Sequence, residues 1–235
     1  MKRQLLLTAV EEEAAPLIRP LRNARTHSCG QIRWTCGELA GQPVAISYGG
    51  VCKVNAAATV QCCLDHLDCS GVWMCGTAGA MDPRCQIGDV VVVTRCAYHD
   101  VDNQGVLIEA FPYRKSCWFD SDPQALRLAF QAASALQPRW QVFYGSAVSG
   151  EQFIDQKGRD AIVSAFSPLC VDMETAAAAH VCSLHDVPFA AVRAISDTPF
   201  HSGLDVYHQH SAEAAEHAAA LILAMLRQRS AGTDE

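Results

Sequence analysis

Residues 171–179 read Val-Asp-Met-Glu-Thr-Ala-Ala-Ala-Ala, and this stretch decides the fold. A short apolar strand leads directly into an alanine-rich helix that is expected to begin at Glu174. Further along, residues 192–197 read Val-Arg-Ala-Ile-Ser-Asp, which predicts a second strand that ends in a hydroxyl and a carboxylate. The carboxyl ends of the strands form the ligand crevice of an open α/β sheet. Glu174 and Asp197 are therefore expected at one site.

The rest of the chain alternates between strands and helices in the same way. Strands are expected at residues 4–10, 31–38, 43–48, 71–76, 88–95, 141–149, 169–173 and 189–195, and helices at residues 12–23, 53–66, 123–137, 156–166, 174–185 and 208–228. Residues 88–95 are a continuous β-branched run, typical of a strand that is covered on both faces. The pattern predicts a single α/β domain over residues 1–235, with a mixed, mostly parallel central sheet and helices on both faces. Residues 230–235 are expected to be a frayed tail.

The composition narrows the class of protein. Half of the 235 residues are apolar, 18% are charged and the net charge is −7, which disfavours a nucleic-acid partner. No apolar run reaches the ~18 residues that a membrane span needs, so no membrane partner is expected. The 12 cysteines are scattered without a Cys-x-x-Cys pair. Free thiols in a reducing cytoplasm are expected, with no metal and no cofactor.

Residues 97–122 are predicted to form a long loop. It is rich in aromatic residues, namely Tyr98, Phe111, Tyr113, Trp118 and Phe119. A loop of this length in a compact domain is usually functional, as a lid over a pocket or as a subunit contact. A loop that packs only on its own side chains is the alternative.

Each acidic residue of interest has a structural and a chemical interpretation. Residues 11–13 are three glutamates after the first strand, and acids there offset the helix dipole. The chemical interpretation is that one of the three faces the cleft at the strand ends and acts as a general base. Glu174 either caps its helix or accepts hydrogen bonds from a vicinal diol such as ribose. Asp197 is either an N-cap or Asx-turn acid or a general acid. Residues 76–80, Gly-Thr-Ala-Gly-Ala, form either a tight turn or a loop that a ligand approaches closely.

Five short segments, taken in order, resemble one known family. They are Val-Glu-Glu-Glu at 10–13, Gly-Thr-Ala-Gly at 76–79, Ser-Gly-Glu-Gln-Phe-Ile at 149–154, Val-Asp-Met-Glu-Thr-Ala-Ala at 171–177 and Val-Arg-Ala-Ile-Ser-Asp at 192–197. Together they resemble the bacterial 5′-methylthioadenosine/S-adenosylhomocysteine nucleosidases of the purine nucleoside phosphorylase superfamily, from Leu5 to Ile222. The resemblance implies a nucleoside phosphorylase-like fold and a cytoplasmic enzyme of methionine salvage. It also implies a hydrolytic N-glycosidase that acts on a nucleoside and water, and a homodimer in which residues 97–120 close the partner's pocket.

The resemblance also implies roles for individual residues. Glu13 would activate the attacking water, and Asp197 would donate a proton to purine N7 with the help of Ser196. Glu174 would accept hydrogen bonds from the 2′ and 3′ hydroxyls of ribose. The further substrate-binding positions would be Thr77, Ala78 and Gly79 on the ribose side, Phe153 and Ile154 at the purine, Met173 beside the ribose, and Val10, Val51 and Tyr207 around the 5′ substituent.

Several segments depart from the family pattern. Residues 49–53 read Gly-Gly-Val-Cys-Lys where the family has Ser-Gly-x-Gly-Lys, and Thr77 replaces the usual serine. Residues 109–120 and 198–201 also differ. Because these changes surround the 5′ pocket, the sequence indicates the reaction more strongly than the 5′ group.

Three other interpretations stay open. The first is a futalosine or aminodeoxyfutalosine hydrolase, which performs the same chemistry on a different nucleoside. The second is a nucleoside phosphorylase, for which Arg19, Arg22 and Arg25 offer positive charge while Glu13 would repel phosphate. The third is a binding or scaffold protein without catalysis. It has no need of a general acid, so the three acids together argue against it.

Overall fold

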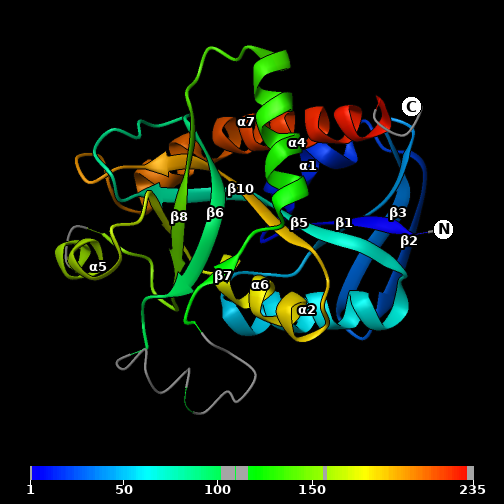
Figure 1. Ribbon diagram of the computed structural model, residues 1–235, viewed down its shortest axis with the longest axis horizontal. Helices are drawn as coiled ribbons and strands as arrows, with labels where there is room; N and C mark the ends of the chain where they lie inside the picture. Colours follow the sequence, from blue (N-terminus) through cyan, green and yellow to red (C-terminus); the bar gives the residue numbers. More distant parts are fainter. Residues whose placement is uncertain (1, 102–108, 110–115, 156–157, 232–235) are drawn as a thin grey trace.

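A mixed β-sheet runs through the centre of the computed structural model, and part of it closes on itself (Figure 1). The structure describes residues 2–101, 109, 116–155 and 158–231. The strands are β1 (Arg3–Thr8), β2 (Arg22–Cys29), β3 (Ile32–Leu39), β4 (Gln42–Tyr48), β5 (Cys69–Ala80), β6 (Val90–Tyr98), β7 (Phe119–Asp120), β8 (Val142–Ser149), β9 (Cys170–Asp172) and β10 (Phe189–Asp197). The predicted mixed α/β fold is confirmed.

Strand β10 connects the two halves of the sheet. It pairs in parallel with β5 and antiparallel with β6, and the path β6–β8–β9–β5 then closes a ring of five strands. Strands β1, β4, β3 and β2 extend the sheet from β5 in that order. The pairings β1–β4, β1–β5, β5–β10, β6–β8 and β8–β9 are parallel. Residues 191–194 of β10 are therefore paired on both sides, and its carboxyl end continues along β5 as far as Asp197.

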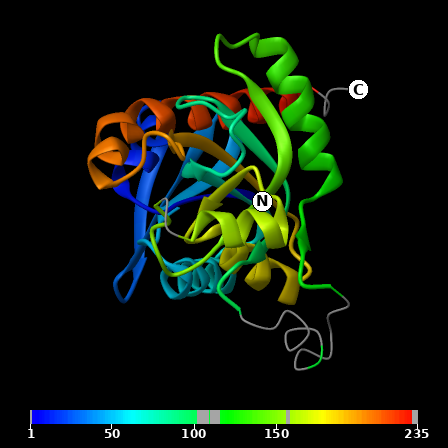
Figure 2. The same ribbon diagram turned by 90° about the vertical axis from the view of Figure 1, so that its left-hand side faces the viewer.

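Helices cover both faces of the sheet (Figures 1 and 2). Helices α1 (Glu11–Ile18), α4 (Pro123–Leu136) and α7 (Leu204–Ala231) lie on one face, and α2 (Lys53–His66) and α6 (Thr175–Leu184) lie on the other. Helix α5 (Arg159–Phe166) lies at one end. Among the described helices, none has both the length and the apolar character that crossing a bilayer requires.

The apolar side chains of the strands pack into two separate hydrophobic cores. In β1, Leu5 and Leu7 pack into the core under α2 and α6, whereas Leu6 packs into the core under α7. In β6, Val91 and Val93 face the first core, and Val90 and Val92 face the second. Side chains alternate between the faces of a strand, so continuous apolar runs supply both layers. Each fully buried Leu or Val contributes about 1.5–3 kcal/mol.

The structure corrects three predicted elements. The helix predicted at 12–23 ends at Ile18, and residues 22–29 form β2. Every residue of this edge strand is exposed, so it carries no apolar alternation. Pro16 lies inside α1 and beyond its first turn. Residues 77–80 were predicted as a turn or loop, but they continue β5 because β10 and β9 pair with them.

The aromatic loop predicted at 97–122 is shorter than expected. Tyr98 belongs to β6, and Phe119 belongs to β7, which pairs with β6. The predicted roles of Phe111 and Tyr113 lie outside the described residues. At the other end of the chain, Ser230 was expected in a frayed tail. It lies in α7 and donates a hydrogen bond to the carbonyl oxygen of Ala40. The rest of that predicted tail, residues 232–235, lies outside the described part.

Candidate active site

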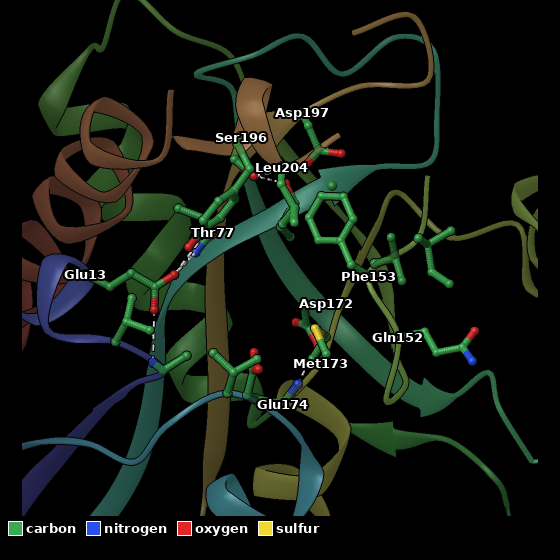
Figure 3. Close-up of a pocket in the computed structure, with 18 residues that line it drawn as sticks. Glu13, Thr77, Gln152, Phe153, Asp172, Met173, Glu174, Ser196, Asp197 and Leu204 are labelled. Carbon is green, nitrogen blue, oxygen red and sulfur yellow. Dashed lines mark hydrogen bonds between the residues drawn. The ribbon is translucent and has the colours of Figure 1, made fainter. Parts of the chain in front are cut away.

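A cavity of about 230 Å³ opens where β1, β5, β9 and β10 end (Figure 3). Every residue that the sequence predicts for the site lines it, although the roles of these residues stay predictions. They are Val10, Glu13, Val51, Thr77, Ala78, Gly79, Phe153, Ile154, Met173, Glu174, Ser196, Asp197 and Tyr207. The structure adds five lining residues, namely Ala9, Gln152, Val171, Asp172 and Leu204. Glu13, Glu174 and Asp197 stand at three separate places around the cavity.

Glu13 is the buried member of the acidic run, since Glu11 and Glu12 are exposed. Its Oε2 accepts a hydrogen bond from the N–H of Ala9 at 2.9 Å, in the turn that starts α1. Its Oε1 accepts from the N–H of Thr77 at 2.7 Å and from the Thr77 hydroxyl at 2.9 Å. Three donors therefore fix the orientation of this carboxylate.

Glu174 occupies the N-cap position of α6, but its side chain does not cap the helix. Asp172 does so, because its Oδ1 accepts from the N–H groups of Glu174 and Thr175, both at 3.1 Å. The Glu174 carboxylate is free to face the cavity, where its Oε1 accepts from the N–H of Cys52 at 2.9 Å. The simple capping interpretation of Glu174 is therefore wrong.

A fully buried guanidinium, that of Arg193, lies behind Asp172 and Glu174. Its Nε is 2.9 Å from Asp172 Oδ2, and its Nη2 is 3.4 Å from Glu174 Oε2. Burial alone would lower the pKa of Arg193, but the charges of Asp172, Glu174 and Glu13 outweigh burial and raise it. Burial raises the pKa of Glu174 to about 7, although Arg193 and the Cys52 N–H favour the charged carboxylate. Glu174 thus titrates near neutral pH.

Gly76 makes this close approach of charged groups possible. A Cβ at this position of β5 would lie 2.6 Å from Arg193 Nη1 and 2.8 Å from Glu13 Oε1. Both groups are buried and held by hydrogen bonds or ion pairs, so a Cβ here would disturb them. The glycine therefore allows Glu13 and Arg193 to flank the same strand.

Asp197 has different neighbours. Its Oδ1 accepts a hydrogen bond from the Ser196 hydroxyl at 3.0 Å, and its Oδ2 lies 3.2 Å from Arg159 Nη2. It ends strand β10 and does not start a helix, so the N-cap interpretation is wrong. Burial raises the pKa of Asp197, and Ser196 and Arg159 reduce this effect. No backbone N–H donates to the Asp197 side chain among the described residues, whereas Glu13 and Glu174 each accept at least one such hydrogen bond.

Arg159 connects Asp197 to the loop before α5. Its Nη2 also donates to the Ile154 carbonyl oxygen at 3.2 Å, and its Nη1 donates to the Ala80 carbonyl oxygen. The guanidinium is itself buried. It therefore fixes Asp197 relative to Ile154, a residue on the wall where the sequence places the purine.

An aromatic pair forms the outer wall of the cavity. Phe153 and Tyr207 meet edge to face, with ring centroids 6.3 Å apart. Phe153 is 38% exposed, so its ring has a free face that a flat ligand can cover. Val51 and Leu204 are also partly exposed near the mouth.

One of the two arginines could be recognised from the sequence. Arg193 is a charged residue within an apolar strand, and such a residue must be paired when it is buried. Arg159 follows a polar segment and has no such signal, because only the tertiary fold brings it to Asp197.

Comparison with known proteins agrees with this geometry. The sequence matches the phosphorylase superfamily over residues 3–227. It is 31% identical to a Bacillus subtilis (strain 168) protein named 5′-methylthioadenosine/S-adenosylhomocysteine nucleosidase, over 96% of this chain and 99% of that protein.

Solved structures of nucleosidases also resemble this chain. The nucleosidase of that name from Neisseria meningitidis, in complex with methylthio-immucillin-A, superposes with a TM-score of 0.87 at 28% identity. The alignment covers 97% of this chain and all of that chain. A futalosine hydrolase of Helicobacter pylori strain 26695 has a TM-score of 0.86 over 97% of this chain and 98% of its own. Its identity is 22%, so it shows the fold alone. The chain belongs to the 5′-methylthioadenosine/S-adenosylhomocysteine nucleosidase family of the phosphorylase superfamily.

Proposed function

We propose that the protein is a hydrolytic N-glycosidase that cleaves the N9–C1′ bond of 5′-methylthioadenosine and S-adenosylhomocysteine. The products are adenine and the 5′-substituted ribose. The observation that carries this proposal is the presence of three carboxylates, in three different environments, around one cavity. The names of the relatives support the choice of substrate.

The reaction moves charge in two directions. The N9–C1′ bond breaks with its electron pair going to the purine, so the sugar becomes cationic and the base becomes anionic. A water oxygen then bonds to C1′ and loses a proton. The reaction therefore needs an acceptor for the water proton, negative charge beside the sugar and a proton donor for the base. Glu13 accepts the water proton, Glu174 places negative charge beside the sugar, and Asp197 donates a proton to the base.

Glu13 suits the role of general base because it lines the cavity and three donors fix the orientation of its carboxylate. Glu174 suits the ribose, since its carboxylate faces the cavity and accepts two hydroxyl hydrogen bonds in its ionised form. Its negative charge also stabilises the cationic sugar. Both residues lie beside Arg193, which balances their charge when the cavity is empty.

Asp197 suits the role of general acid because burial favours its protonated form. A protonated carboxyl donates its proton to purine N7, and transfer of this kind contributes ~10²–10⁴-fold to a rate. Phe153 stacks on the purine from the same wall. A carboxyl at this position also favours adenine over a 6-oxopurine, for which an amide is the usual partner.

The lining of the cavity favours hydrolysis over phosphorolysis. None of the 18 described lining residues is Arg or Lys. Arg19 pairs with Glu216 at 2.6 Å on the surface, and Arg22 and Arg25 belong to the exposed strand β2. A phosphate dianion would therefore meet Glu13 without a cationic partner, whereas water is neutral.

We further infer a homodimer that works in a reducing cytoplasm in methionine salvage. Exposed apolar side chains near the mouth, Val51, Val54, Leu204 and Phe200, support a subunit contact there. The cysteines of the described residues are all free thiols, which supports a reducing compartment. We expect light scattering to give twice the 25.4 kDa chain mass, and a monomer mass at micromolar concentration would refute the dimer.

The first test is release of free base in the absence of phosphate. We expect adenine from methylthioadenosine and adenosylhomocysteine, no dependence on added phosphate, and at most slow release from futalosine.

Asp197→Asn should lower kcat by about 10²–10⁴-fold while binding of the substrate analogue persists. The matched control is Asp82→Asn, at a surface pair with Arg84, which should leave the rate unchanged.

Three results would count against the proposal. A strict requirement for phosphate would make the protein a phosphorylase. Preferred cleavage of futalosine would assign it to the rival hydrolase. Near-normal turnover by Asp197→Asn would remove Asp197 as the acid.

The second test is the acid limb of the pH profile. Glu174 must be ionised to accept the ribose hydroxyls, and its pKa in the free protein is about 7. We therefore expect kcat/KM to fall as the pH drops below about 7. Bound ribose hydroxyls stabilise the carboxylate, so the same limb in kcat should lie at lower pH. If the acid limbs of kcat/KM and of kcat lay at the same pH, Glu174 would not bind the ribose.

The third test concerns Arg159. Its charge lowers the pKa of Asp197, so Arg159→Gln should raise that pKa further and move the alkaline limb of kcat/KM to higher pH, by about one unit. Arg159→Lys keeps the charge and should restore the limb. Arg84→Gln, at the exposed pair, is the control. An alkaline limb that does not move in folded Arg159→Gln would show that Arg159 has no influence on the acid.

A further inference from the structure

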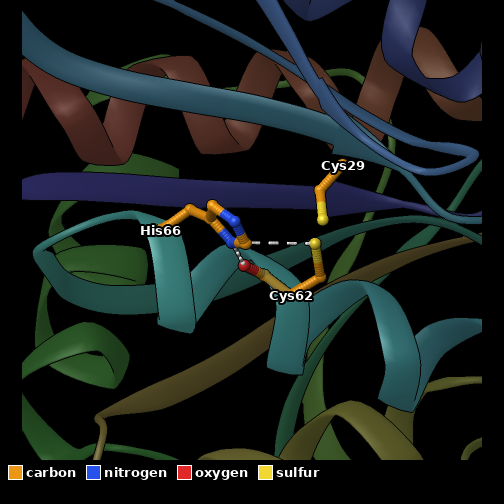
Figure 4. Close-up of side chains that lie close together, drawn as sticks. All are labelled: Cys29, Cys62 and His66. Atoms are coloured by element: carbon orange, nitrogen blue, oxygen red, sulfur yellow. Dashed lines mark hydrogen bonds between the residues drawn. The ribbon is translucent and has the colours of Figure 1, made fainter.

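Two thiols and an imidazole lie close together where the end of β2 meets α2 (Figure 4). Cys29 ends the edge strand β2, and Cys62 and His66 lie one turn apart on α2. One potential ligand atom from each residue lies within 4.8 Å of the other two. Among the described residues, this is the group of three His, Cys, Asp or Glu side chains with such spacing.

The distances are close to those of a metal site. Zn–S bonds of about 2.3 Å and Zn–N bonds of about 2.0–2.1 Å place tetrahedral ligand atoms roughly 3.5–3.8 Å apart. Cys62 Sγ is 3.9 Å from His66 Nδ1. Small side-chain rotations would therefore bring the three atoms around one ion. The spacing Cys-x₃-His on a helix directs both of its ligands to one side.

The surroundings already orient the imidazole. His66 Nδ1 is 2.8 Å from the carbonyl oxygen of Cys62, and the ring packs on Trp34 with centroids 5.4 Å apart. Histidines that bind metals through one nitrogen usually donate the other N–H to a carbonyl oxygen or a carboxylate. Binding through Nε2 keeps this hydrogen bond, and binding through Nδ1 replaces it. Asp65 adds negative charge beside Cys62.

We propose that Cys29, Cys62 and His66 form a binding site for a thiophilic d¹⁰ cation, with zinc as its reference ion. Two thiolates and an imidazole select such an ion over magnesium or calcium, which prefer oxygen ligands. Three protein ligands leave a fourth position for water. The ion would join the exposed edge strand β2 to α2, and so stabilise the part of the sheet that carries the fewest buried side chains.

The site is separate from the proposed catalysis. Helix α2 begins beside the cavity at Lys53, next to the Cys52 N–H that binds Glu174, and Cys62 lies nine residues further along. At 1.5 Å per residue this is about 14 Å along the helix axis. The ion would therefore change stability and would not take part in bond cleavage.

The test uses the full chain, reduced and freed of metal, and it does not depend on nucleosidase activity. Zinc is titrated against a chromophoric chelator, and Co²⁺ is the spectroscopic probe. We expect one equivalent to bind, a tetrahedral Co²⁺ spectrum with thiolate charge-transfer bands, a higher Tm with zinc and no competition by magnesium. Cys29→Ser, Cys62→Ser and His66→Ala should each weaken binding by about tenfold or more.

Cys117→Ser and His210→Ala are matched controls, because these residues lie outside the cluster. They should bind zinc as the wild type does. Equal affinity in the cluster variants and the controls would overturn the site, as would absence of binding by the reduced wild type. A Cys29–Cys62 disulfide that forms in air, in a chain that binds no zinc when reduced, would identify a redox pair and also overturn the proposal.

Discussion

The buried charge of Arg193 is the constraint on which the cavity depends. Its guanidinium lies inside strand β10, with no exposure to solvent, and it is satisfied by Asp172, Glu174 and the hydroxyl of Thr175. A buried charge that loses its partner costs about 3–5 kcal/mol, so these groups must stay together for the protein to remain folded. These contacts join β10 to β9 and to the start of α6, and a hydrogen bond from Arg193 Nη1 to the Thr77 carbonyl oxygen at 3.3 Å joins it to β5. One ion-pair network therefore both stabilises the fold and positions the Glu174 carboxylate.

The three carboxylates that we propose for catalysis have different environments. Glu13 accepts three hydrogen bonds, and Glu174 shares a guanidinium and one backbone N–H. Asp197 has one hydroxyl and a guanidinium that also binds carbonyl oxygens. Pairs of acids whose environments separate their pKa values take different roles in catalysis. These contacts support the proposed roles of a base, a charged ribose ligand and a proton donor.

Much of this arrangement could be predicted from the sequence, because short motifs place acids at the ends of apolar strands. Glu174 and Asp197 follow from such motifs, whereas the choice of Glu13 among three glutamates rests on the family resemblance. The continuous valines of β6 indicate a strand covered on both faces. Strand β2 was missed because an exposed edge strand carries no apolar pattern. The extension of β5 through Thr77 was missed because its glycines and alanines suggest a turn, and pairing with β10 overrides that tendency. Arg159 was missed because only tertiary contact defines its role.

The central claim is that Asp197 carries a proton while Glu174 is ionised when a nucleoside occupies the cavity. Carbon-13 NMR of labelled Asp and Glu carboxyl groups tests this directly, with Asp197→Asn and Glu174→Gln used for assignment. The protein is titrated free and with a non-hydrolysable methylthioadenosine analogue. The account predicts that, at neutral pH in the complex, the Asp197 carboxyl shows the chemical shift of the protonated acid and Glu174 shows that of the carboxylate. An ionised Asp197 together with a protonated Glu174 in the complex would contradict it.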